Sequence, residues 1–161
     1  MIRPGTAADL PALTEIYNGY VAHSHVTFDD VPFTAAEREA WFGHYSLTGP
    51  HRLLVVEEEG AVLGYATSSP FRPKPGYRTT VETSVYLAPG ATGRGLGTAL
   101  YDVLLPLVDA EGVHRALAGI ALPNDGSVAL HRRCGFTPVG TFTEVGWKGR
   151  WVDVAWYERQ P

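Results

Sequence analysis

The chain has 161 residues, 45% of them hydrophobic, which suits a single domain spanning 1–161 with a sizeable core. Its formal net charge of −4 argues against the basic face by which proteins usually bind nucleic acids. No stretch approaches the run of about 18 apolar residues typical of a membrane span, and a single cysteine, Cys134, excludes an internal disulfide. We therefore expect a cytoplasmic protein with no metal site, no nucleic-acid partner and no membrane partner.

The N-terminal part of the chain is predicted to form a short strand and two helices. Residues 1–3 suit an edge strand. Thr6 is a suitable N-cap for a helix whose apolar residues recur at helical spacing until about Ala22. Thr34 is a suitable N-cap for a second helix, which Gly49 and the proline after it should end.

The loop between these helices, residues 23–33, combines two histidines and two aspartates with Phe28. The polar residues lack the spacing of a zinc site, so a metal ion is not expected here. Phe28 either anchors the loop to the core or contacts a ligand. Its position alone leaves both interpretations open.

Two short strands, 53–57 and 61–67, are predicted to form a hairpin around an acidic turn. A proline-rich loop, 69–78, follows, and its prolines restrict the directions in which long side chains can point. The loop carries three cations although the chain is acidic overall: Arg72, Lys74 and Arg78. Fixed cations indicate a site for an anionic group of a substrate, although ordinary surface charges would give the same pattern.

A strand, a glycine-rich turn and a helix follow one another without a gap from residue 81 to about 108. Glycines at 93, 95 and 97 allow several backbone N–H groups to point one way, and with the open helix start they suit a phosphate-like anion. A nucleoside triphosphate loop is excluded because Thr98, not lysine, follows Gly97. A dinucleotide fingerprint is disfavoured because the turn lies mid-chain and lacks its later acidic residue. A loop without a ligand is the plain alternative.

The last third of the chain is predicted to contain three strands and a short helix. The strands are 116–122, 137–145 and 151–158. A turn at 123–127 leads into the helix, which Asp125 or Ser127 should cap. Three tryptophans in or beside the final strands should close either a core or a contact between two copies of the chain: Trp147, Trp151 and Trp156.

Several motifs occur in a fixed order along these elements. They are Val85-Tyr86-Leu87, the glycine turn, Ile120 to Asp125, Ser127, Leu130-His131 and Cys134-Gly135-Phe136, together with Ile16-Tyr17-Asn18, Val26-Thr27-Phe28, Trp41, Arg72, Tyr77, Thr80-Val81-Glu82 and Trp151-x-Asp153-Val154. The series resembles the GNAT family of acyl-CoA-dependent N-acetyltransferases, and within it the phosphinothricin and methionine sulfoximine acetyltransferases. The resemblance implies an α/β fold, with a mixed, mostly antiparallel sheet of about six or seven strands and helices on both faces. It also implies that a cofactor enters where two neighbouring strands splay.

The resemblance implies acetyl-CoA as the co-substrate, with its pantetheine arm and pyrophosphate on the strand end and the glycine turn. The cofactor-binding residues would be Val85, Tyr86, Leu87, Gly93, Arg94, Gly95, Leu96, Gly97, Thr98, Asn124 and Ser127. The family usually has Gln or Arg at the position of Thr92. We therefore expect Arg94 to supply the cation that this chain lacks at that position.

An amine acceptor is mostly protonated near neutral pH and must lose a proton before it attacks a thioester. Glu82 is the candidate base, because a carboxylate among apolar strand residues should be partly desolvated and have a raised pKa. Periodicity alone leaves open an outward Glu82 paired with a surface cation, and the resemblance favours the base. It adds His131 and Tyr86 as candidates to protonate the departing thiolate.

The resemblance further implies a homodimer and a small anionic amino-acid acceptor, such as phosphinothricin or methionine sulfoximine. The acceptor-binding residues would be Phe28, Arg72, Lys74, Tyr77, Glu82, Thr83 and Ser84. Lys74 departs from the arginine common at its position and offers a point charge without a bidentate fork. Two alternatives stay open: a sensor that binds acyl-CoA without catalysis, and an acetyltransferase for a protein N-terminus or a polyamine, which these cations should repel.

Overall fold

One seven-stranded sheet forms the centre of the computed structural model, which describes residues 1–161. Its strands are β1 (Ile2–Pro4), β2 (Arg52–Glu58), β3 (Ala61–Pro70), β4 (Thr80–Leu87), β5 (Arg115–Ala121), β6 (Thr137–Trp147) and β7 (Trp151–Arg159). They lie in the order β1-β2-β3-β4-β5-β7-β6, and every neighbouring pair is antiparallel except β4 and β5. The predicted mixed, mostly antiparallel sheet is confirmed.

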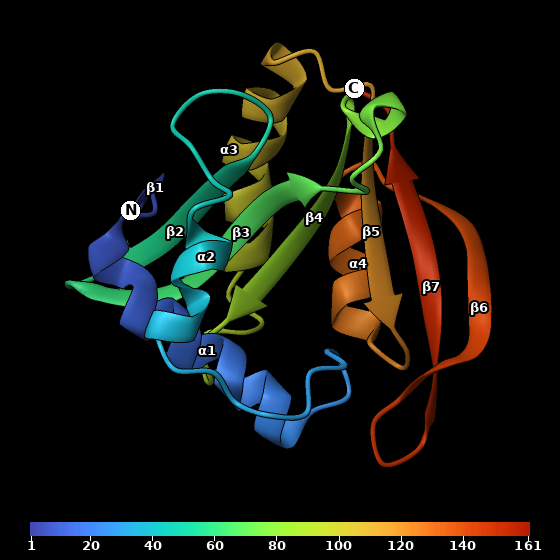
Figure 1. The fold of residues 1–161 in the computed structure, drawn as a ribbon, viewed down its shortest axis with the longest axis horizontal. Coiled ribbons are helices and arrows are strands. Elements are labelled where there is room, and N and C mark those ends of the chain that lie inside the picture. The colour runs from blue at the N-terminus through green and yellow to red at the C-terminus, as the bar shows by residue number, and fades with distance from the viewer.

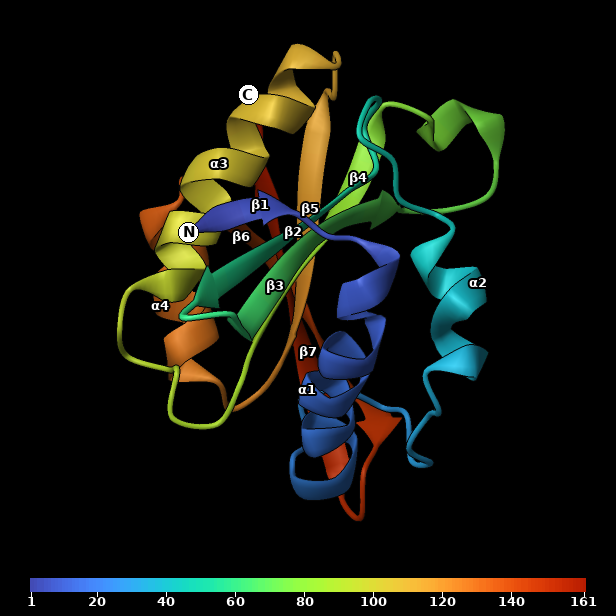
Figure 2. The same cartoon turned by 90° about the vertical axis from the view of Figure 1, so that its left-hand side faces the viewer.

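Four helices cover the two faces of this sheet. They are α1 (Leu10–His23), α2 (Glu39–Phe42), α3 (Leu96–Ala110) and α4 (Asp125–Arg133). Short 3₁₀ turns occur at Ala7–Asp9, Ala36–Arg38 and Pro75–Tyr77. Figure 2 shows α1 and α2 on one side of the sheet and α3 and α4 on the other, so the prediction of helices on both faces is also confirmed.

Asp9 is the N-cap of α1 itself, and the 3₁₀ turn that leads into this helix begins at the predicted cap, Thr6. Its backbone N–H and its hydroxyl donate to the carboxylate of Asp9, at 2.7 and 2.9 Å. Arg3 of β1 donates to both oxygens of the same carboxylate at 2.8 Å, which lowers the pKa of Asp9 to about 2. The cap therefore ties the first helix to the edge strand.

The second predicted helix is wrong in length. The Thr34 hydroxyl does accept the N–H of Glu37 at 3.2 Å, but the N-cap of the helical turn is Ala35, and α2 ends at Phe42. Gly43 follows at once, and glycine is a poor helix former. The apolar residues that suggested a longer helix instead pack as a cluster, with the Trp41 ring 5.1 Å from Tyr45 and 5.9 Å from Tyr65 of β3.

The two faces of the sheet have cores of different size. The larger core lies under α3, where Leu100, Tyr101 and Leu104 have no exposed surface. The smaller core lies under α1 and includes Leu13 and Tyr65. Because packing is less extensive on the α1 side, the sheet there has room for a pocket.

The parallel pair β4 and β5 separates soon after it forms. Only three residue pairs join the strands, from Thr80 with Arg115 to Glu82 with Leu117. Beyond them the strands diverge, and Figure 1 shows the two arrows running apart with α4 behind the gap. From residue 83 onward, the edge of β4 that faces β5 has no strand partner. The predicted splay is thus present, and it lies at the middle of the sheet.

Candidate active site

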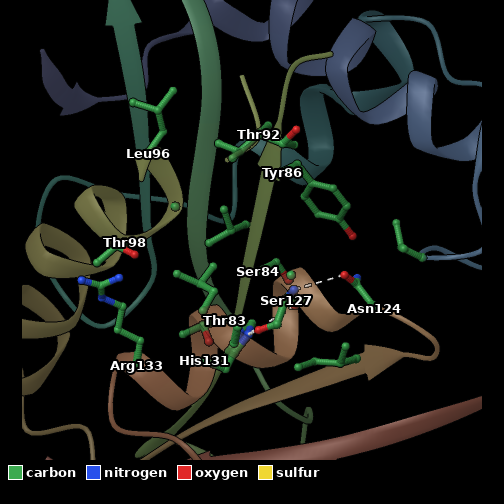
Figure 3. Close-up of a pocket in the computed structure, with 18 of the residues that line it drawn as sticks. Thr83, Ser84, Tyr86, Thr92, Leu96, Thr98, Asn124, Ser127, His131 and Arg133 are labelled. Carbon is green, nitrogen blue, oxygen red and sulfur yellow. Dashed lines mark hydrogen bonds between the residues drawn. The ribbon is translucent and has the colours of Figure 1, made fainter. Parts of the chain in front are cut away.

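A cleft of about 520 Å³ opens where β4 and β5 diverge. Its walls come from β4, the glycine turn, the end of β5 and α4, and Figure 3 shows their side chains converging on it. The cleft contains almost every residue predicted to bind the cofactor, namely Val85, Tyr86, Leu87, Gly93, Gly95, Leu96, Gly97, Thr98, Asn124 and Ser127. Sequence reasoning missed several others that share it, among them Tyr20, Val26, Gly119, Ile120 and Arg133.

The glycine turn has the backbone conformation that its composition predicts. Gly93 and Gly95 have φ values of 75° and 78°, in the left-handed region that favours glycine, and Gly95 is the N-cap of α3. A Cβ on Gly97 would lie 3.0 Å from Leu130 of α4 and 3.7 Å from Val85. The glycines therefore allow α3 to start close against the cleft, with unpaired N–H groups and the positive end of its dipole at the wall.

Two arginines lie near this turn, Arg94 and Arg133, and only Arg133 lines the cleft. Arg94 does not line the cleft and instead pairs with Glu58, with 2.6 Å between nitrogen and oxygen. Arg133 of α4 lines the cleft, and in Figure 3 its side chain extends toward Thr98 at the start of α3. Helical spacing could have indicated Arg133 from the sequence, because it lies on the same face of α4 as Gly126 and Ala129, which also line the cleft.

The start of α4 also differs from the prediction. The N-cap is Asn124, whose side-chain oxygen accepts the N–H of Ser127 at 3.1 Å (Figure 3). Asp125 and Ser127, expected as caps, lie inside the first turn. The Asn124 side chain is thereby held at the rim of the cleft.

His131 is enclosed in the protein with both ring nitrogens occupied. Nδ1 lies 2.8 Å from the carbonyl of Ser127 and so donates to it, and Nε2 lies 3.0 Å from the Tyr101 hydroxyl. The side chain is only 4% exposed, and burial lowers its pKa. His131 is therefore a neutral histidine with internal partners on the cleft wall.

Alternation along β4 divides the predicted site residues between two faces. Thr83 is buried on the cleft side, where its hydroxyl accepts from the Tyr101 hydroxyl at 3.1 Å. Glu82, Ser84 and Tyr86 face the α1 side, opposite Ser69, Thr67 and Tyr65 of β3. Ser84 and Tyr86 also reach the cleft, so they connect the two sides.

Tyr86 lies among other aromatic rings, 5.2 Å from Tyr17, 5.3 Å from Tyr20 and 5.5 Å from Tyr65 between centroids. Burial raises the pKa of Tyr86 well above its ordinary value. Its hydroxyl therefore stays protonated at neutral pH. In Figure 3 this hydroxyl points into the open space of the cleft, toward the side of Asn124.

Glu82 makes no hydrogen bond and no ion pair within the protein. Its side chain is mostly buried on the strand, and this burial raises its pKa, while the nearby charge of Arg72 opposes the shift less strongly. Because it has no partner, this carboxylate is free to accept a proton, and its pKa is closer to neutrality than that of an exposed glutamate.

The remaining residues predicted to bind the acceptor lie on two surface loops. The guanidinium of Arg72 is 5.0 Å from the centre of the Phe71 ring, and the Tyr77 ring is 5.5 Å from that same ring. Lys74 is exposed at the start of the 3₁₀ turn. Phe28 packs against Gly146 of β6, where a Cβ would overlap its ring.

A second pocket, of about 220 Å³, lies on the α1 side of β4 and was not predicted. It shares Ser84 and Tyr86 with the cleft. Its other lining residues are Tyr17, Asp29, Phe33, Glu37, Arg38, Trp41, Tyr45, Tyr65, Thr67 and Ser69. The arrangement is a long cleft with a smaller side pocket, joined at the strand that carries Glu82.

Comparison with known families agrees with this geometry, which combines a splayed strand pair with an anion-binding turn. The model of the acetyltransferase (GNAT) family matches residues 12–136, most of the chain. The chain belongs to the GNAT family of acetyltransferases. No group of three or more His, Cys, Asp or Glu residues is placed to hold a metal ion, and no helix is long and apolar enough to cross a membrane.

Individual relatives are similar over nearly their full length. A phosphinothricin N-acetyltransferase of Streptomyces coelicolor is 55% identical, covering 98% of this chain and 94% of its own. An L-methionine sulfoximine/L-methionine sulfone acetyltransferase of Pseudomonas aeruginosa is 39% identical, covering 98% and 92%. A crystal structure of a GNAT superfamily phosphinothricin acetyltransferase from Sinorhizobium meliloti, in complex with acetyl-CoA, superposes with a TM-score of 0.92 at 37% identity, covering 99% and 87%.

Proposed function

We propose that this protein transfers an acetyl group from acetyl-CoA to the primary amine of a small anionic amino acid, of the kind represented by phosphinothricin and methionine sulfoximine. The single observation that carries the proposal is the unpaired, desolvated Glu82 at the strand where the cleft and the second pocket meet. The activities of the similar proteins described above support the donor and the acceptor class.

The cleft supplies the groups needed to hold the donor. Backbone N–H groups at residues 93–98 and the N-terminus of α3 suit the pyrophosphate, and Arg133 adds a positive charge. The free edge of β4 near Val85 suits the pantetheine amides, and Asn124 lies at the rim. A backbone N–H there would polarise the thioester carbonyl, a contribution of about 3 kcal/mol in comparable oxyanion sites.

The transfer requires the amine to lose two protons and the thiolate to gain one. Glu82 takes the first proton from the acceptor ammonium, directly or through one water, so that the nitrogen lone pair can form the C–N bond, and this proton passes to solvent. As the C–S bond breaks, the Tyr86 hydroxyl gives its proton to the departing thiolate, and the second proton of the nitrogen replaces it on Tyr86. We assign this role to Tyr86 in preference to His131, because the Tyr86 hydroxyl faces the cleft while both His131 nitrogens have internal partners.

The cationic loop would bring anionic acceptors to this base. Arg72 is close enough to influence the pKa of Glu82, and Lys74 and Tyr77 lie on the same loop. Phe28 lies on the loop after α1 and packs against Gly146, and Ser84 lines both cavities. Lys74 would attract an anion as a point charge, without the directional pairing of an arginine.

A thiol-release assay tests the proposal. With acetyl-CoA, we expect CoA release to depend on phosphinothricin or methionine sulfoximine. Polyamines and peptides with a free N-terminus should release little CoA, because Arg72, Lys74 and Arg78 repel cations. Release that depends on a polyamine or a peptide, and not on either amino-acid analogue, would contradict the proposal.

We also propose a homodimer in the cytoplasm. Strand β6 is an edge strand with four large apolar side chains that are more than half exposed, and Trp151 of β7 lies 5.0 Å from one of them. These four are Val139, Phe142, Val145 and Trp147. Such a stripe is typical of a surface that a second copy covers. Light scattering should give twice the chain's mass, and Trp147→Lys should shift it toward the monomer; a monomeric wild-type protein would refute the dimer.

A further inference from the structure

The second pocket lies on the same sheet face as Glu82. Its floor consists of two cross-strand pairs, Tyr65 with Tyr86 and Thr67 with Ser84. The next pair along the strands is Ser69 with Glu82, and Ser69 also lines the pocket, so the pocket reaches the residue directly opposite the candidate base. A small acceptor with its amine at Glu82 can therefore extend into this pocket.

The roof of the pocket contains a buried cation, Arg38. Only 6% of this residue is exposed, and its guanidinium is stacked 3.8 Å from the centre of the Trp41 ring and 4.5 Å from that of Tyr17. Aromatic faces compensate part of the charge, but they leave the N–H groups in the guanidinium plane without acceptors. The Nη1 atom of Arg38 is buried and makes no hydrogen bond.

This absence of a partner sets Arg38 apart from the other well-covered arginines. Arg3 pairs with Asp9 and Glu57, Arg52 pairs with Glu111, and Arg159 pairs with Asp109. Arg38 is more buried than any of them and has no ion pair. Because an unpaired buried charge costs stability, a guanidinium kept in this state is more easily explained by a ligand than by the fold.

Two carboxylates line the same pocket, and both have other donors. Asp29 accepts from the hydroxyl of Tyr17, and Glu37 accepts from the N–H and hydroxyl of Thr34 at 2.7 and 2.8 Å. These hydrogen bonds lower the pKa of Glu37. Neither carboxylate forms an ion pair with Arg38, so the positive charge in the roof is left for another anion.

A second unused donor lies on the pocket floor. The hydroxyl of Tyr65 is buried and has no hydrogen-bond partner, and the residue is only 1% exposed. Burial raises the pKa of Tyr65 and outweighs the opposing effect of the nearby Arg38 charge, so the hydroxyl keeps its proton. The pocket thus combines a fixed cation and a neutral donor, and an oxyanion complements both.

We propose that Arg38 and Tyr65 bind an oxyanion of the acceptor amino acid, a carboxylate or a phosphinate, while its amine lies at Glu82. This subsite is separate from Arg72 and Lys74, which do not line the pocket. It rests on the proposed acetyl transfer and makes the acceptor's charge a requirement of the site. An acceptor without an oxyanion would leave two buried donors unpaired, which is a strong basis for discrimination.

Steady-state kinetics with three acceptors tests the subsite: L-methionine sulfone, its carboxamide and phosphinothricin. Removing the charge in Arg38→Met should lower kcat/KM for L-methionine sulfone by roughly 10- to 100-fold, with the acetyl-CoA KM unchanged. The carboxamide, already a poor acceptor, should lose little. Arg38→Lys should recover part of the loss, and Tyr65→Phe should cost roughly 2- to 10-fold. Arg132→Met, at an exposed arginine on α4 outside both cavities, is the control.

The pattern of losses identifies the oxyanion. A loss with both L-methionine sulfone and phosphinothricin assigns the carboxylate to Arg38, whereas a loss with phosphinothricin alone assigns the phosphinate. An equal loss with all three acceptors would show that Arg38 only supports the fold, and no loss with any would show that the pocket is unused. Either result overturns the subsite.

Direct binding separates this proposal from the acetyl transfer on which it rests. If wild-type protein acetylates none of the three acceptors, the proposed function fails, and the subsite is tested by titrating phosphinothricin while observing the ¹⁵N resonances of the Arg38 guanidinium. The anion site is supported if these resonances shift saturably in the wild-type protein and shift less, or not at all, in Tyr65→Phe. Unshifted resonances overturn it.

Discussion

The binding surfaces on the two faces of β4 are formed by different chemical groups. On the cleft side, the surface comes mainly from the backbone: a free strand edge, left-handed glycines and the start of α3. On the α1 side, the surface comes from side chains that are buried without partners, Glu82, Arg38 and the hydroxyl of Tyr65. The first arrangement suits the phosphates and amides of acetyl-CoA, and the second suits discrimination among acceptors.

The largest effect should follow from removing the carboxylate on the acceptor side. Glu82→Gln keeps the shape of the side chain but cannot take a proton, so kcat should fall by roughly 10²- to 10⁴-fold. The acetyl-CoA KM should stay within about twofold, because the donor surface lies on the other side of the strand. Normal turnover in this variant would remove Glu82 from the mechanism, and a large change in acetyl-CoA KM would show that the two faces are not independent.

A change in the donor turn should give the opposite pattern. An alanine at Gly95, where φ is 78°, costs about 1–2 kcal/mol and disturbs the N–H groups at the start of α3. Gly95→Ala should therefore raise the acetyl-CoA KM roughly 5- to 30-fold and leave the acceptor KM unchanged. Gly90→Ala is the matched control, because Gly90 has the same φ but does not line the cleft. Equal KM effects in both variants would mean that strain, and not anion binding, causes the loss.

A smaller effect should distinguish the two arginines near the turn. Arg133→Met should weaken acetyl-CoA binding by roughly 2- to 5-fold, since a partly exposed charge contributes up to about 1 kcal/mol, and the effect should shrink as salt is added. Arg94→Met should leave acetyl-CoA affinity unchanged, because this arginine pairs with Glu58 away from the cleft. Calorimetric titration with acetyl-CoA measures the affinity of each variant. A larger loss of affinity in Arg94→Met than in Arg133→Met would identify Arg94 as the cation that binds the phosphates.

The smallest effect concerns stability. The folded-state pKa of Glu82 is raised above the ordinary value of 4.5, so protonation is favoured by folding. Its contribution is fully favourable below about pH 4.5 and is lost as the pH rises through the raised pKa. Glu82→Gln should therefore raise the melting temperature by a few degrees at pH 8 and leave it unchanged near pH 4. A lower melting temperature at pH 8 would show that Glu82 is stabilised by a partner.

The contrast between the faces also explains how far the sequence alone could lead. The β4 strand, the glycine turn and α3 were predictable, because glycine spacing and apolar periodicity act locally and determine backbone conformation directly. Arg133 escaped prediction because its position depends on how α4 packs against the turn. The pairing of Arg94 also escaped prediction, because nothing in the sequence shows that Glu58 lies beside it.

The α1 side was less predictable because burial there depends on long-range packing. Arg38 lies between two glutamates in the sequence, a pattern typical of an exposed helix, yet Trp41 and Tyr17 cover it. The same packing shortened the second helix, since Trp41 and Tyr45 cluster on β3 after the chain leaves helical geometry at Gly43. Glu82 was a candidate base because an amine acceptor requires one and because the family resemblance favours it.

The pH dependence of kcat/KM tests the central claim most directly, namely that an unpaired carboxylate on β4 prepares the amine for transfer. In wild-type protein the rate should fall on the acidic side as Glu82 is protonated, with an apparent pKa above the ordinary 4.5. In Glu82→Gln that limb should vanish, leaving only the limb set by the acceptor amine. Identical acidic limbs in the two proteins would contradict the account.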